Sequence, residues 1–147
     1  MGKTDKKLYW DVIGKKRLAL LPRLSFLKDS GFYLAGGTAL ALQIHHRISV
    51  DFDFYTQNPF DSEKILLHFQ QISDKVTLIQ KSENTLIIKI DGVEVSLFTY
   101  PYVLVEPLVE IEHLKLAATQ DIAAMKLIAI IQRGLQRDFI DLYFLLK

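Results

Sequence analysis

The sequence contains no cysteine among its 147 residues. Disulfide bonds, thiolate metal sites and cysteine nucleophiles are therefore excluded, and the absence is compatible with a reducing compartment. The chain also lacks any apolar run near the roughly 18 residues that a membrane-spanning helix needs. Its charged amino terminus is not followed by the apolar segment of a signal peptide. We therefore expect a soluble, cytoplasmic protein with no membrane partner.

Neither sign of charge dominates the chain. Its 18 lysines and arginines nearly balance 17 aspartates and glutamates, which leaves a formal net charge of +1. The overall basic character of many nucleic-acid-binding domains is therefore missing, and any site for a polyanion must be local. With 50% hydrophobic and 24% charged residues, the composition is that of an ordinary globular protein. The length predicts a single domain, residues 1–147.

The order of predicted elements indicates an α+β fold, with a mixed β-sheet flanked by helices and a carboxy-terminal helical tail. We expect helices over 1–30, a sheet-containing core over 31–105 and further helices over 115–147. Predicted strands within the core cover 32–35, 49–55, 75–80, 85–90 and 93–100. Core helices are expected over about 38–45 and from Asp61 or Ser62 to about 72. Asp91 and Gly92 predict a two-residue hairpin turn.

The tail pattern predicts two helices. Thr119 is the expected cap of the first, which Gly134 ends. The second begins at about Gln136, and its apolar residues recur with the period of a buried helix face. We expect that face to consist of Phe139, Leu142, Tyr143 and Leu146. The aromatic side chains of Trp10, Tyr33, Tyr100 and Tyr102 are expected to serve packing rather than base stacking.

Two aspartates lie two residues apart in a predicted strand. Because side chains at i and i+2 project from the same face, Asp51 and Asp53 place two carboxylates side by side. Such charges repel unless a cation lies between them. Mg²⁺ commonly takes one or two carboxylates together with substrate phosphates. A metal site is therefore favoured over an acidic strand edge, with Val50, Phe52 and Phe54 packed on the opposite face.

Gly36, Gly37 and Thr38 join the first predicted strand to the helix that Thr38 is expected to cap. Glycines let the backbone approach a phosphate closely, and a helix N-terminus presents unpaired N–H groups to an anion. The same three residues also suit an ordinary tight turn. They do not form a Walker A loop, because no Gly-Lys-Ser/Thr follows them.

The two motifs together, Gly36-Gly37-Thr38 and Arg47-x-Ser49-x-Asp51-x-Asp53, resemble the signature of the nucleotidyltransferase superfamily related to DNA polymerase beta. The match is closest to the AbiEii toxin family of abortive-infection and type IV toxin–antitoxin systems. Residues 121–129 and 133–143 resemble later motifs of that family. The similarity covers most of residues 30–147 and implies a polymerase-beta-like nucleotidyltransferase fold.

The resemblance also implies roles for particular residues. Asp51 and Asp53 would bind Mg²⁺ or Mn²⁺, and Lys126 would contact the triphosphate of an NTP. Arg47 and Ser49 would orient the strand that carries the carboxylates. The nucleotide-binding set that it implies is Gly36, Gly37, Thr38, Arg47, Ser49, Lys126 and Arg133.

The residues of the carboxy-terminal tail also indicate a site without the resemblance. Lys126, Ala129 and Arg133 share one helical face, which suits a triphosphate. The same pattern also suits a basic surface that pairs with Asp138 or Asp141. These two aspartates share a face of the last helix, away from the centre of its apolar stripe, and the resemblance gives them a supporting role at the site.

One position departs from the family pattern. Ser96 stands where a third acidic residue is expected, and a hydroxyl does not supply the missing negative charge. Glu94, two residues earlier, is expected on the same face of its strand and is the candidate third metal ligand.

The sequence therefore predicts a metal-dependent nucleotidyltransferase that moves a nucleoside monophosphate from an NTP to a hydroxyl. By resemblance, the acceptor is RNA, plausibly the tRNA 3′ end, and the protein is a toxin with a cognate antitoxin. Two alternatives stay open. One is a catalytically degenerate member of the fold that binds a nucleotide or a partner. The other is a transferase acting on a protein or a small molecule such as an aminoglycoside.

Overall fold

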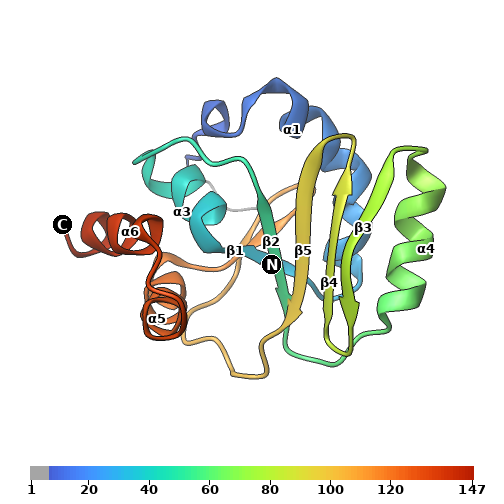
Figure 1. Ribbon diagram of the computed structural model, residues 1–147. Coiled ribbons are helices and arrows are strands. Elements are labelled where there is room, and N and C mark those ends of the chain that lie inside the picture. Colours follow the sequence, from blue (N-terminus) through green and yellow to red (C-terminus); the bar gives the residue numbers. More distant parts are fainter. Residues whose placement is uncertain (1–6) are drawn as a thin grey trace.

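The computed structural model describes residues 7–147; residues 1–6, part of the expected amino-terminal helices, lie outside that range. Seven strands form one sheet in the order β3-β4-β5-β2-β1-β7-β6 (Figure 1). The strands are β1 (Tyr33–Ala35), β2 (Phe52–Thr56), β3 (Val76–Ser82), β4 (Thr85–Ile90), β5 (Val93–Thr99), β6 (Val109–Glu110) and β7 (Lys115–Leu116). The pairs β2–β5 and β1–β7 are parallel and the others antiparallel, which confirms the expected mixed sheet.

Helices flank this sheet at both of its ends. Figure 1 shows α5 and α6 beside α3 on one side, and α4 beside the edge strand β3 on the other. The α-helices are α1 (Gly14–Leu20), α2 (Ser25–Asp29), α3 (Gly36–Ile44), α4 (Ser62–Ile72), α5 (Thr119–Gln132) and α6 (Gln136–Leu146). Two short 3₁₀ helices, η1 (Trp10–Val12) and η2 (Leu21–Leu24), complete the amino-terminal part of the described chain. No helix within residues 7–147 combines the length and apolar character needed to cross a membrane.

Local sequence signals explain several element boundaries. The Asp61 carboxylate accepts hydrogen bonds from the backbone N–H groups of Glu63 and Lys64, which starts α4 as expected. The predicted hairpin turn joins β4 to β5, and both of its residues have positive φ, +50° at Asp91 and +80° at Gly92. This conformation is the one that two-residue hairpins favour. Capping and turn chemistry were thus readable from sequence in these places.

The second strand is shorter than expected. It begins at Phe52, so residues 49–51 form a connecting segment, and Val50 is 46% exposed rather than packed beside Phe52 and Phe54. The two phenylalanines are buried, as predicted. Two expected helix caps are also wrong, because α3 begins at Gly36 and the N-cap of α5 is Ala118, without a side-chain hydrogen bond.

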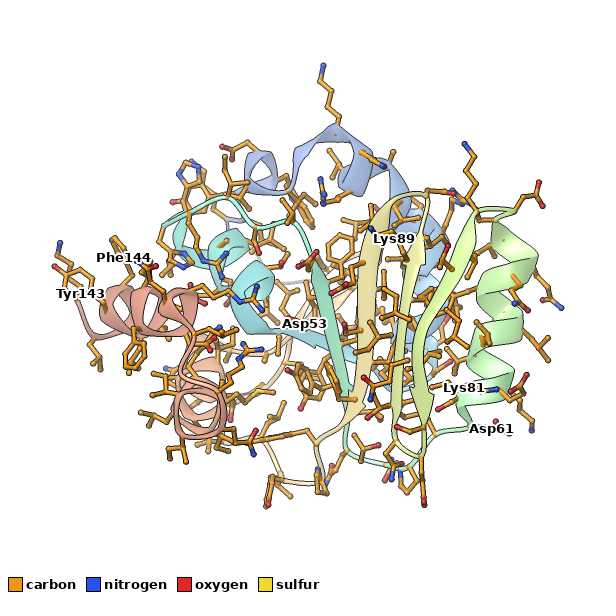
Figure 2. All side chains as sticks on the ribbon, viewed as in Figure 1. Asp53, Asp61, Lys81, Lys89, Tyr143 and Phe144 are labelled. Carbon is orange, nitrogen blue, oxygen red and sulfur yellow. The ribbon has the colours of Figure 1, made fainter. Side chains whose placement is uncertain are left out.

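The last helix presents the opposite face from the one expected. Phe139, Tyr143 and Leu146 are 52%, 58% and 77% exposed, whereas Asp138 and Asp141 are completely buried. Figure 2 shows Tyr143 near the free end of α6. The prediction of a buried apolar stripe on α6 is therefore wrong, because ion pairs turn the aspartates inward.

Phe54 tests how much the centre of the sheet contributes to stability. Its side chain is 1% exposed on β2, between β1 and β5. The Phe54→Ala variant is expected to lower the free energy of unfolding by about 3–5 kcal/mol, because it leaves a cavity that its neighbours cannot fill. Urea denaturation measures the change. Leu78→Ala, at a half-exposed position on β3, should lower it by less than about 1 kcal/mol; equal losses would contradict this account.

Candidate active site

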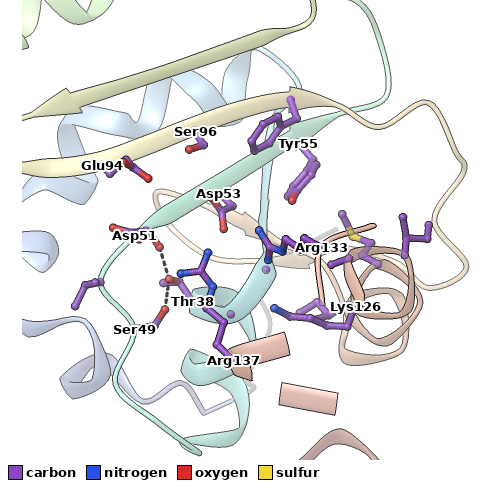
Figure 3. Close-up of a pocket in the computed structure, with 18 of the residues that line it drawn as sticks. Thr38, Ser49, Asp51, Asp53, Tyr55, Glu94, Ser96, Lys126, Arg133 and Arg137 are labelled. Carbon is purple, nitrogen blue, oxygen red and sulfur yellow. Dashed lines mark hydrogen bonds between the residues drawn. The ribbon is translucent and has the colours of Figure 1, made fainter. Parts of the chain in front are cut away.

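A cleft of about 540 Å³ opens between the sheet and the carboxy-terminal helices. Its floor is formed by side chains of β2 and β5, and its walls by the start of α3, by α5 and by the start of α6. Figure 3 shows acidic side chains on the strands facing basic side chains from the helices. Ten of the twelve residues predicted for the site line this cleft: Gly36, Gly37, Thr38, Arg47, Ser49, Asp51, Asp53, Glu94, Lys126 and Arg133. Asp138 and Asp141 lie behind its wall.

The paired acids occupy the centre of the cleft. Asp53 lies on β2 opposite Ser96 of β5, and Asp51 immediately precedes β2. Burial raises the pKa of Asp53 to about 6, and the negative charge of Asp51 adds to the rise. Cationic side chains of the helices oppose these effects without cancelling them. The site therefore holds negative charge that a bound cation would stabilise.

The two glycines make room for charged side chains. Gly36 has φ +69°, and a Cβ atom on it would lie 2.9 Å from Oδ2 of Asp53. A Cβ on Gly37 would lie 1.9 Å from Nη2 of Arg47. Any side chain at Gly36 would combine backbone strain with a collision. The glycine pair thus lets the N-terminus of α3 approach both the carboxylate and the guanidinium.

Thr38 ties the segment before β2 to α3. Its hydroxyl lies 2.6 Å from Oγ of Ser49 and also donates a hydrogen bond to the backbone carbonyl of Asp51 (Figure 3). Thr38 and Ser49 are both buried. Thr38 therefore positions the carboxylate-bearing segment rather than capping the helix, and Ser49 contacts the Thr38 hydroxyl.

Lys126 is a buried partner of two carboxylates. Its side chain is only 5% exposed, and Nζ lies 3.0 Å from Oδ1 of Asp138 and 2.6 Å from Oδ2 of Asp141. The ion pairs that the sequence left open thus form in the interior rather than on the surface. Lys126 links α5 to α6, and most of its charge is already neutralised where it borders the cleft.

Two arginines extend this network. Arg47 donates from Nε and Nη2 to the two oxygens of Asp141, at 2.7 and 3.0 Å. His46 Nε2 lies 2.6 Å from the same carboxylate. Although burial alone would raise the pKa of Asp141, hydrogen bonds from His46, Arg47 and Lys126 hold it well below its usual range. Arg133 similarly makes two 2.8 Å hydrogen bonds to Asp138.

Arg137 belongs to the segment Arg137-Asp138-x-x-Asp141, which the resemblance implies shapes the site, although no separate role was expected of Arg137 itself. It lies in the first turn of α6 and lines the cleft, and its charge acts on Asp53. Within residues 7–147 its guanidinium has no ion pair or hydrogen bond, in contrast to Arg47 and Arg133. The sequence pattern that points to Arg137 is its spacing of four residues from Arg133, since residues four apart share a helix face. The turn at Gly134, however, interrupts that helix.

The donor set fits a Mg²⁺ ion held by two carboxylates. Within the described part of the chain, no group of three histidine, cysteine, aspartate or glutamate side chains is close enough to hold a metal. Glu94 lines the cleft but does not complete a three-acid cluster with Asp51 and Asp53. Two carboxylates with substrate phosphates are nevertheless an ordinary Mg²⁺ environment. The expected third-ligand role of Glu94 is therefore unsupported by this arrangement.

Comparison with known proteins identifies the family. The model of the family described as "Nucleotidyl transferase AbiEii toxin, Type IV TA system" matches residues 19–147. The chain belongs to the AbiEii family. An uncharacterised protein of Aquifex aeolicus, aq_aa25, is 45% identical over 137 residues, and the match covers 90% of this AbiEii chain and 66% of that protein. The chain thus spans about two thirds of the length of this relative.

Solved structures agree with the fold of the AbiEii chain. The Megavirus polyadenylate synthase superposes with a TM-score of 0.63 at 19% identity, over 89% of this chain and 31% of that one. ANT(2″)-Ia in complex with adenylyl-2″-tobramycin gives a TM-score of 0.59 at 11% identity, over 89% and 87%. The fold is that of the polymerase-beta-like nucleotidyltransferases, as the resemblance implied.

Replacing Lys126 tests the buried network. Lys126→Met leaves Asp138 and Asp141 buried with one cation fewer, and it should lower the free energy of unfolding by about 3 kcal/mol at pH 7. The pKa values of both aspartates are lowered in the folded state, so their contribution is present above the ordinary aspartate pKa and is lost as the pH falls below it. The penalty should therefore shrink below about pH 4. Lys64→Met, on the exposed surface of α4, is the matched control.

Asp53 is expected to show the opposite pH dependence. Because its folded-state pKa is raised to about 6, its ionised form opposes folding, and this cost appears as the pH rises from about 4 through 6. Asp53→Asn should therefore raise the free energy of unfolding by about 1–2 kcal/mol at pH 8 and leave it nearly unchanged at pH 4. Urea denaturation of the metal-free protein measures both values. Asp74→Asn, at an exposed position, should change neither; a matching gain there would refute the explanation.

Proposed function

We propose that this AbiEii-family chain is a metal-dependent nucleotidyltransferase that moves a nucleoside monophosphate from an NTP to a hydroxyl. One observation carries the proposal: Asp51 and Asp53 share a cleft with the glycine turn of α3 and with the Arg137 guanidinium, which has no ion pair among the described residues. A carboxylate pair for a metal beside groups that bind phosphate is the arrangement that phosphoryl transfer chemistry requires.

Asp51 and Asp53 would hold the Mg²⁺ or Mn²⁺ ion. When bound, the metal would neutralise phosphate oxygens and stabilise the charge of the leaving pyrophosphate. The acceptor hydroxyl attacks the α-phosphorus of the NTP, a new P–O bond forms, the bond to the β-phosphate oxygen breaks, and pyrophosphate departs. Glu94 lines the same cleft and is the candidate acceptor of the hydroxyl proton.

Phosphate binding is assigned to groups at the helical wall. Gly36 and Gly37 open the N-terminus of α3 to an anion. Arg137 brings a positive charge that no ion pair within residues 7–147 neutralises, and the half-exposed Arg133 guanidinium lies four residues earlier, at the end of α5. Lys126, with its charge shared between two aspartates, supports this wall and contributes to the positive potential next to Asp53.

We further propose RNA as the acceptor, with the tRNA 3′ end as the first candidate, and a toxin role controlled by a cognate antitoxin. The family description, which names a type IV toxin–antitoxin system, supports the toxin role and the antitoxin, whereas the RNA acceptor rests on the family resemblance. A polyadenylate synthase and an aminoglycoside-bound ANT(2″)-Ia share the fold, so the fold accommodates more than one kind of acceptor. Identifying the molecule that carries a transferred label separates RNA from a protein or a small molecule.

The proposal is tested by incubating the protein with labelled NTPs, Mg²⁺ and total RNA. We expect label transfer that EDTA abolishes, and a loss of at least a hundredfold in Asp51→Ala and Asp53→Asn, because each variant removes one of two metal-binding carboxylates. Asp74→Asn, on the exposed surface, should retain full activity. Absence of transfer, or equal transfer by Asp51→Ala and the unaltered protein, would reject the enzymatic assignment.

A second candidate function is nucleotide binding without transfer, and Ser96 is the observation that favours it. Ser96 pairs with Asp53 across the β2–β5 ladder, at the position where a third acid was expected, and it is buried without a charge. Calorimetry with an NTP and Mg²⁺ beside the transfer assay distinguishes the two. Binding without turnover supports the second function, and turnover removes it.

A further inference from the structure

Two adjacent strands divide the floor of the cleft into a polar half and an aromatic half. Along β5, Glu94, Ser96 and Phe98 are two residues apart and all line the cleft, so they share one face. On β2, Asp53 pairs with Ser96, and Tyr55 pairs with Phe98. Acidic and hydroxyl groups thus occupy one end of the floor. Aromatic rings begin two residues further along both strands, at the next side chain on the same face (Figure 3).

The aromatic half is a connected set of three rings. The centroids of Tyr55 and Phe98 lie 5.4 Å apart with an interplanar angle of 33°, and those of Tyr55 and Tyr100 lie 6.2 Å apart at 80°. All three side chains line the cleft and are partly exposed. Two apolar side chains of α5, Ile122 and Met125, line the same cavity.

We propose that this aromatic half, formed by Tyr55, Phe98 and Tyr100 against α5, binds the nucleobase of the NTP. This inference rests on the proposed function and adds to it the position of the base. It also gives the rings a role beyond the packing that was expected of Tyr100.

The two ends of an NTP match the two halves of the cleft in chemistry. An NTP has an anionic end and an aromatic end joined by one sugar, and the cleft has an ionic half and an aromatic half in the same order. Two residues of a strand advance about 6.6 Å, so Tyr55 begins roughly one sugar ring beyond Asp53. A volume of about 540 Å³ falls in the range of pockets for small ligands. One nucleotide therefore satisfies both halves.

Stacking also predicts the kind of selectivity. Ring faces attract any base, and stacking is tolerant of base identity. We expect all four NTPs to bind, with the larger purines binding more tightly than the pyrimidines.

Tyr100 is the position to test, because it follows β5 and its removal leaves the ladder between β2 and β5 intact. Calorimetry in Mg²⁺ compares the dissociation constant of ATP with that of inorganic tripolyphosphate, which has the anionic end alone. In Tyr100→Ala, ATP should bind about 5- to 100-fold more weakly, whereas tripolyphosphate should bind as before. Tyr100→Phe and Tyr100→Trp should retain ATP binding, since they keep a ring.

Two further variants show whether weaker ATP binding comes from the lost ring or from a disturbed structure. Phe98→Leu keeps an apolar side chain but removes a ring, and it should weaken ATP and leave tripolyphosphate unchanged. Tyr143→Ala carries the same substitution at a tyrosine of α6 that does not line the cleft, and it should alter neither ligand (Figure 2). Thermal unfolding confirms that each variant is folded before its binding is measured.

The outcomes separate this inference from the function on which it rests. If the ratio of the two dissociation constants stays at the wild-type value in both ring variants, the base does not lie on these rings. A higher KM for the RNA acceptor with unchanged ATP binding would likewise overturn it, and would assign the rings to the acceptor. If the unaltered protein binds neither ATP nor tripolyphosphate, the proposed function fails as well.

Discussion

The ion pairs of Lys126 with Asp138 and Asp141 hold the wall of the cleft together. Through the two aspartates, Lys126 also holds Arg133 and Arg47, so one buried ammonium group connects α5, α6 and the segment after α3. Two aspartates buried without cations would cost several kcal/mol, so these ion pairs are needed for α5 and α6 to pack as they do. The same contacts turn the first turn of α6 so that Arg137 reaches the cleft.

The opposite side of the cleft keeps its charge unsatisfied. Asp53 and Asp51 repel each other in a partly buried position, and no cation is paired directly with either carboxylate within residues 7–147. Thr38 holds the segment through the backbone carbonyl of Asp51, and the missing side chain of Gly36 leaves room for the Asp53 carboxylate. The ion pairs around Lys126 thus neutralise one set of carboxylates, whereas the charges of Asp51 and Asp53 are not paired in the described range. Only this second set would be stabilised by a bound metal ion.

Much of the site was predictable because it lies in short segments. The glycine turn, the carboxylates two residues apart and the hairpin at Asp91-Gly92 each depend on local backbone chemistry. The face of α6 was not predictable in this way. Its apolar period marks Phe139 and Tyr143 as core residues, yet both are exposed, because Asp138 and Asp141 find cations supplied by α5 and by Arg47. Ion pairs with residues distant in the chain produce no periodic pattern in the sequence of the helix that carries the aspartates.

Sequence alone therefore determined the family, the mixed sheet and the presence of Asp51 and Asp53 beside a glycine turn, since each follows from motif spacing or local conformational preference. Tertiary structure decided which charged side chains form ion pairs with each other and which remain available to a ligand. It paired Lys126 with two aspartates and gave Arg137 no ion pair in the part of the chain that the structure describes, and it aligned the rings of Tyr55 and Phe98 beyond the acids. These outcomes depend on strand register and helix packing, which bring together residues distant in the chain.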